Sequence, residues 1–158
     1  MAQMTDRTDR TGGKSLAEKV ALAFGATYLL VGLIGFAATA GVGFAEDEGN
    51  RLLGIFEVNP LHNVVHLLIG AALLWAGMQG VNAARAVNTT VGATYLLVGI
   101  VGLFITDSEA NILAINHADN LLHLGSAAIL LTAGLMGPRT NATTDTGTTT
   151  RSTTGMRS

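Results

Sequence analysis

An octapeptide, GATYLLVG, occurs twice in this chain of 158 residues, at Gly25–Gly32 and again at Gly92–Gly99. A second matched pair follows the two copies: Asn59–His66 reads NPLHNVVH and Asn116–His123 reads NHADNLLH. Both of these segments fit the pattern N-x-x-[HD]-N-x-x-H, in which x is any residue. Because whole segments recur in the same order, the sequence predicts two copies of a two-helix unit.

The chain is poor in charged residues, which make up 13% of it against about 25% in ordinary soluble domains. The charges between the two tails gather in short gaps, and each apolar stretch between them approaches the roughly 20 helical residues that cross a bilayer. A soluble bundle would carry charges along one face of each helix, whereas these stretches are apolar all round. We therefore expect an all-α membrane protein with four transmembrane helices, near residues 20–42, 61–80, 87–105 and 118–137.

These four helices are predicted to form one transmembrane domain, residues 20–137. Each unit crosses the membrane an even number of times, so the units are expected to be parallel helical-hairpin repeats, related by a pseudo-twofold axis along the membrane normal. The flanking residues 1–19 and the threonine-rich residues 138–158 are predicted to be disordered tails, because they hold too few apolar residues to order themselves.

Basic residues indicate the orientation in the membrane. They gather in the two tails, and Arg85 lies in the second gap, whereas the first and third gaps are mainly acidic. The positive-inside rule therefore predicts a multi-pass protein of the bacterial plasma membrane with both termini in the cytoplasm. The first apolar stretch also resembles a secretory signal that ends in Ala38-Thr39-Ala40. Because its core recurs at Gly92, in the middle of the chain, we expect it to be retained as a membrane helix.

Small residues follow the polar motif along one face of the second and fourth helices. In lipid, helices associate through close packing of small side chains, because no hydrophobic force drives them together. We therefore expect the second and fourth helices to face each other along two matching stripes. These stripes are His62, His66, Gly70 and Gly77 on the second helix, and Asp119, His123, Ala127 and Gly134 on the fourth.

The asparagines that open the two motifs stand where helix N-caps are expected. Asn59 is followed by Pro60, which suits the first position of a helix. Asn116 is followed three residues later by Asp119, which can complete a capping box and favours the positive end of the helix dipole. Helix-start chemistry thus accounts for much of the motif.

Helix capping does not explain His66 and His123, which lie about 9 Å along their helices at 1.5 Å per residue. An ionisable side chain at such a depth is either a functional group or a satisfied structural one. In the structural interpretation, the two imidazoles hydrogen-bond to each other, or to Asn63 and Asn120, and hold the two repeats in register.

The other interpretation is a ligand site. His62 with His66, and Asp119 with His123, are pairs four residues apart, so each pair lies on one helical face. Three imidazoles and a carboxylate could hold Zn²⁺ or another divalent metal. Haem binding and a proton or small-ion pathway are further alternatives for the same polar cluster. No cofactor is part of the leading prediction.

Tyr28 and Tyr95 are the other repeated polar side chains. On the assumption that the first helix ends near residue 42, Tyr28 should lie roughly 10 Å deeper in the membrane than His66. That distance is too large for a direct bond, so we expect both tyrosines to be packing residues.

Several classes of function are excluded. The chain has no cysteine, which excludes disulfides, thiolate metal sites and cysteine nucleophiles. It shows no nucleophile or phosphate-loop motif, and its net charge of −2 gives no reason to expect nucleic-acid binding. The leading prediction is a non-enzymatic structural or interaction protein. Its expected partners are the lipid bilayer and a second copy or another membrane protein.

The segment Leu53–Gly70, LGIFEVNPLHNVVHLLIG, together with Asp119–His123, DNLLH, resembles a family of small bacterial four-helix membrane proteins. This family is the domain of unknown function 4383, common in high-GC Gram-positive bacteria, and the resemblance covers residues 16 to 137. It implies an integral membrane protein and carries no mechanism.

Overall fold

The computed structural model describes residues 13–136, and the tails predicted to be disordered fall largely outside them. In chain order the elements are α1 (Leu16–Ala38), β1 (Asn50–Leu52), β2 (Phe56–Val58), α2 (Pro60–Gln79), α3 (Val81–Ile105) and α4 (His117–Leu135). All four helices are long and apolar enough to cross a membrane. The fold is therefore that of an all-α, multi-pass membrane protein, with one short β-hairpin in a loop.

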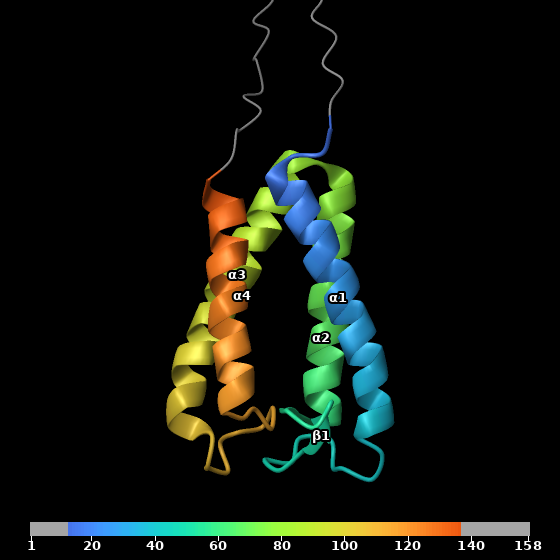
Figure 1. Ribbon diagram of the computed structural model, residues 1–158, viewed down its shortest axis with the longest axis vertical. Helices are drawn as coiled ribbons and strands as arrows, with labels where there is room; N and C mark the ends of the chain where they lie inside the picture. The colour runs from blue at the N-terminus through green and yellow to red at the C-terminus, as the bar shows by residue number, and fades with distance from the viewer. Residues whose placement is uncertain (1–12, 137–158) are drawn as a thin grey trace, which may run out of the picture.

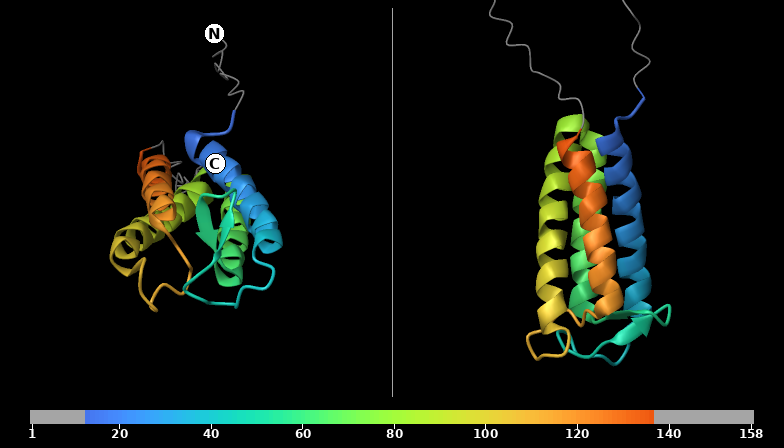
Figure 2. Two further views of the ribbon diagram at one scale, coloured as in Figure 1. Left: turned by 60° about the horizontal axis from the view of Figure 1, so that its bottom comes forward. Right: turned by 60° about the vertical axis from the view of Figure 1, so that its left-hand side comes forward.

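The helices associate chiefly as consecutive antiparallel pairs, α1 with α2 and α3 with α4. In Figure 1 these pairs form the two sides of the molecule. The start of α1, the end of α4 and the turn between α2 and α3 lie at one end, which we call the turn end. The two longer connections meet at the other end, which we call the loop end (Figures 1 and 2).

Three helix boundaries differ from the expected ones by four residues or more, the two ends of α1 and the start of α3. Helix α1 begins four residues early, at Leu16, because Ser15 and Glu18 form a capping box, and it ends at Ala38. Helix α3 begins at Val81 rather than near residue 87, because Gly80 alone turns the chain. Its φ of +115° is in a region that side chains rarely adopt. The second gap is therefore mostly the polar first turns of α3, not a loop.

The β-hairpin was not predicted. Strands β1 and β2 pair antiparallel, with Arg51 opposite Glu57, and they lie in the long connection between α1 and α2. Leu53 and Gly54 turn the chain with φ values of +54° and +75°. Each strand has three residues, too few for a recognisable alternation of apolar and polar positions.

Glycines allow close backbone contact inside each helix pair. A methyl group at Gly70 would lie 2.7 Å from the backbone nitrogen of Leu29 in α1, and one at Gly134 would lie 2.8 Å from that of Thr89 in α3. Gly77 likewise faces Leu22 of α1. The expectation that these stripe glycines join the second helix to the fourth is therefore wrong. They join α2 to α1 and α4 to α3.

The interior is a layer of apolar side chains shared by both helix pairs. Leu73 and Leu130 are fully buried, and Tyr28 and Tyr95 belong to the same cluster as Ala127. Large apolar side chains also cover the outside of the helices, with Phe104 82% and Leu121 74% exposed. This outer surface is suited to lipid rather than to water.

Near the turn end, one polar side chain joins the two helix pairs. Asn88 of α3 is fully buried, and its amide donates a hydrogen bond of 2.9 Å to the carbonyl of Ala17 in α1. The sequence analysis did not single out this asparagine, although a buried amide within an apolar span needs such a partner.

Candidate functional site

The polar motif lies at the loop end, where α2 and α4 begin. The side-chain oxygen of Asn59 accepts a hydrogen bond from the backbone N–H of His62 at 2.8 Å. The side-chain oxygen of Asn116 accepts from Ala118 and Asp119, and the Asp119 carboxylate accepts from the Asn116 N–H at 3.0 Å, which completes a capping box. Asn59 and Asn116 thus occupy the N-cap positions.

The same two asparagines also connect the two halves of the chain. The amide of Asn59 donates to the carbonyl of Ile112 at 2.8 Å, and the amide of Asn116 donates to the carbonyl of Ile55 at 2.8 Å. Ile55 lies four residues before Asn59, and Ile112 lies four residues before Asn116. Each asparagine therefore donates to the carbonyl that stands at the same place in the other half of the chain. Asn59 donates a further bond to the carbonyl of Glu46. The caps were predictable from the sequence but these bonds were not, since spacing alone does not show which loop lies beside a cap.

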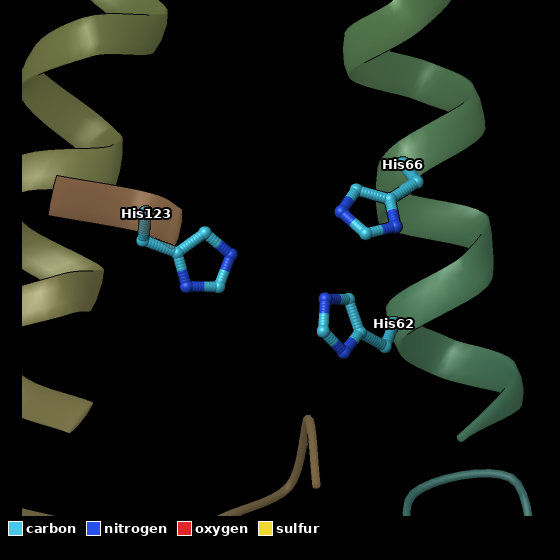
Figure 3. Close-up of side chains that lie close together, drawn as sticks. All are labelled: His62, His66 and His123. Atoms are coloured by element: carbon cyan, nitrogen blue, oxygen red, sulfur yellow. The ribbon is translucent and has the colours of Figure 1, made fainter. Parts of the chain in front are cut away.

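Three histidines converge within the first two turns of α2 and α4. His62 and His66 extend from α2 and His123 from α4, and their rings point toward one another in Figure 3. A nitrogen from each ring lies within 4.8 Å of the other two. All three side chains are buried, with exposed fractions of 2%, 7% and 6%. The structure therefore brings together three of the four residues considered as metal ligands.

The fourth, Asp119, does not join this group. Besides capping Asn116, its carboxylate accepts a hydrogen bond of 3.0 Å from the backbone N–H of Glu57 in β2. Asp119 lies one helical turn before His123, at the start of α4. Backbone N–H groups there have no partner within the helix, and the carboxylate accepts hydrogen bonds at this helix start rather than joining the histidines. The expected set of three imidazoles and a carboxylate is thus reduced to three imidazoles.

The hydrogen bonds expected of structural histidines are not observed among residues 13–136. The Nδ1 atoms of His62, His66 and His123 are buried without a partner there. Asn63 and Asn120, the expected partners, instead donate to the hydroxyls of Thr39 and Thr106 at 3.2 and 3.3 Å. These bonds tie each asparagine to the preceding helix of its own pair.

Tyr28 and Tyr95 do reach the histidines, so their expected separation was wrong. The Tyr28 ring stacks on His66 with centroids 5.5 Å apart, and Tyr95 meets His123 edge-on at 5.0 Å. The two tyrosine rings are themselves 5.5 Å apart. Because α1 ends at Ala38, Tyr28 lies only about 15 Å from that helix end at 1.5 Å per residue. The long side chain of Tyr28 spans the remaining distance to His66.

The polar cluster is closed toward the turn end. Leu73 and Leu130 lie seven residues beyond His66 and His123, on the same helical faces, and both are fully buried. They form an apolar layer about 10 Å along the helices from the imidazoles. The cluster therefore lies near one end of the molecule and is not part of a polar path between the two ends.

Comparison with known proteins agrees with the resemblance noted in the sequence. A family model described as "Domain of unknown function (DUF4383)" matches residues 18–136, which include all the side chains of the site. No curated protein and no solved structure matches the chain. The match covers most of the chain and all but the first two residues of the four-helix region, so the protein belongs to the DUF4383 family.

Proposed function

We propose that this protein is a membrane-embedded metal-binding module in which His62, His66 and His123 hold one divalent transition metal ion between the two helix pairs. The observation that supports it is the convergence of three buried imidazoles, each with an unpartnered Nδ1. A buried polar atom without a partner costs about 1–3 kcal/mol, so three in one place are expected to serve a ligand.

The distances fit such an ion. Nitrogens bound at about 2.0–2.1 Å to tetrahedral Zn²⁺ lie about 3.3 Å from one another. The three nitrogens here lie within 4.8 Å, so they need to approach by at most about 1.5 Å. Rotation of the imidazoles about χ2, which is a soft torsion, supplies movements of that size. Three imidazoles would leave one coordination position for water or another ligand.

The proposal includes a duplicated architecture. We infer that the chain consists of two parallel hairpin repeats, because equivalent residues make equivalent contacts in both. The reciprocal bonds of Asn59 and Asn116, and the bonds from Asn63 and Asn120 to threonines, are the clearest examples. A metal bound by α2 and α4 would then join one helix of each repeat.

We also propose that the protein lies in a bacterial plasma membrane with the turn end in the cytoplasm, as the distribution of Lys and Arg favours. The chain has no cysteine, so single-cysteine variants give an unambiguous test. Glu109→Cys, at the loop end, should react with an impermeant thiol reagent in intact cells, whereas Gln79→Cys, at the turn end, should not. The opposite pattern would reverse the orientation.

The other interpretations have less support. A proton pathway would have to cross the apolar layer formed by Leu73 and Leu130. A haem would need a flat apolar space beside its axial histidine, and the large groove that borders His66 does not contact His62 or His123. A purely structural role is the main rival, since the asparagine bonds already join the two halves.

Metal analysis separates the metal site from a purely structural role. The full chain, purified in detergent without a histidine tag, should contain about one equivalent of a divalent transition metal. The double variant His66→Ala/His123→Ala should lose it. His117→Ala is the matched control, because His117 is an exposed histidine at the start of α4 and outside the cluster. Metal-free wild-type protein that still takes up no added Zn²⁺, with a double variant that is merely less stable, would refute the metal site.

A further inference from the structure

An apolar groove of about 720 Å³ lies between α1 and α4, which are close at the turn end and diverge toward the loop end in Figure 1. Phe24, Val31, Phe56, Leu121 and Ile129 are among the apolar residues that line it, and none of the described residues of the lining is Asp, Glu, Lys or Arg. Leu121 and Ile129 are 74% and 50% exposed on the surface that faces lipid. The groove therefore opens into the hydrocarbon region of the membrane, and its volume is typical of small-molecule sites.

Besides Thr27, whose hydroxyl donates to the carbonyl of Ala23, three polar side chains interrupt this apolar lining: Tyr28, His66 and Ser126. Each is more than nine-tenths buried, with exposed fractions of 6%, 7% and 7%. The Nδ1 atom of His66 has no hydrogen-bond partner among the described residues. The Tyr28 hydroxyl lies close to those of Ser126 and Tyr95 and is likewise buried without a hydrogen-bond partner among the described residues. The groove thus borders buried polar groups that still have bonding capacity.

Gly125 gives independent support for a ligand. A methyl group there would meet no atom within 4 Å, whereas every other helical glycine of the described residues is in tight contact with a neighbour. A glycine inside a helix costs about 1 kcal/mol relative to alanine, so one without a packing role needs another reason. Gly125 lines the groove, and any larger side chain would project into that space.

Comparison of the two halves leads to the same conclusion. Gly125 and Ser126 follow His123 in the second half, where Leu68 and Ile69 stand at the same distance from His66 in the first. The half that borders the groove thus has a glycine and a serine at the two positions where the other half has leucine and isoleucine. This difference both opens space and adds a hydroxyl that can form hydrogen bonds. Helix packing alone does not require the two changes to occur at the same place.

We propose that this groove binds a neutral, ring-headed molecule of the quinone class that is dissolved in the membrane. Its carbonyl oxygen would accept hydrogen bonds from Tyr28 and Ser126, and its ring would pack among Phe24 and Phe56. A phospholipid headgroup or a fatty-acid carboxylate would place a charge in a groove without a charged partner, which is unfavourable. A saturated acyl chain would leave the buried polar groups unpaired. The inference concerns binding alone and does not depend on a metal ion.

The test measures binding of decylubiquinone to the full chain in detergent by native mass spectrometry. We expect a one-to-one complex with the wild type and at least tenfold weaker binding to Gly125→Leu, which narrows the groove beside Tyr28 and Ser126. Tyr28→Phe should weaken binding severalfold, since it removes one hydroxyl. Ala72→Leu is the matched control, because it adds the same side chain to an exposed position of α2 outside the groove, and it should bind like the wild type.

Decylbenzene, which has the tail and a ring but no carbonyl, should bind at least tenfold more weakly than decylubiquinone. Equal binding of the two probes would identify a site for acyl chains and overturn the proposal. Equal binding of the quinone to wild type and Gly125→Leu would also overturn it. Metal content measured on the same samples should be unchanged in Gly125→Leu, so a failure of the metal site and a failure of the quinone site can be told apart.

Discussion

The reciprocal asparagine bonds at the loop end lead to a quantitative prediction. Asn59→Ser keeps the N-cap, because serine and asparagine cap helices about equally well. It removes the amide, which donates to the carbonyls of Ile112 and Glu46, both at 2.8 Å, from a fully buried position. At a net value of about 0.5–1.5 kcal/mol for each hydrogen bond, the loss of stability should be about 1–3 kcal/mol.

Asn116→Ser is the matched comparison, because it keeps its cap and loses a single bond, to the carbonyl of Ile55. Its expected loss is about 0.5–1.5 kcal/mol. Asn59→Ala should lose a further 0.5–2 kcal/mol, roughly, because the cap is removed as well. Asn50→Ser, which removes an exposed bond to the carbonyl of Ala38, should change stability by less than about 0.5 kcal/mol.

The assay is equilibrium unfolding in mixed micelles of SDS and a mild detergent, followed by far-UV circular dichroism. The order of loss should be Asn59→Ala, Asn59→Ser, Asn116→Ser and Asn50→Ser. If Asn59→Ser is no less stable than Asn50→Ser, the bonds between the two halves do not contribute to stability. In that case only the capping role of Asn59 would stand.

Two further predictions concern packing. Gly35→Ala would place a methyl group against the Asn63 amide, which is itself held by a hydrogen bond, so it should destabilise the protein by about 1–3 kcal/mol in the same assay; unchanged stability would show that this contact is loose. Leu73→Ala should cost about 2–5 kcal/mol because the side chain is fully buried. Leu68→Ala, 67% exposed to lipid, should cost far less, and equal losses would contradict the apolar layer.

The sequence was a good guide to features that depend on local chemistry. Helix number follows from the length of apolar stretches, since a bilayer sets the number of residues per crossing. Asn59 and Asn116 were recognisable as caps because a cap involves residues only two or three positions apart. The start of α3 was missed for a related reason: polar residues such as Asn82 suggest a loop, although they suit the first turn of a helix outside the hydrocarbon.

Contacts between helices were predicted less well. Periodicity places Gly70 and His66 on nearby parts of one helical face, but that face is wide enough to meet two neighbours. In the structure Gly70 meets α1, while His66 extends toward His123 of α4. The error for Tyr28 has the same origin, because an estimate along one helix axis ignores where the neighbouring helix begins and how far the side chain reaches.

The sequence by itself determined that the chain has four membrane helices in two similar halves, with a polar motif at the start of the second helix of each. Repetition and hydropathy are sufficient for this, since both can be read along the chain. Only the tertiary structure decided which side chains meet. It placed His62, His66 and His123 together, removed Asp119 from that group, and showed that Gly125 alone among the described helical glycines faces open space. These facts depend on contacts between segments far apart in sequence, and such contacts are set by the packing of backbones that local patterns do not specify.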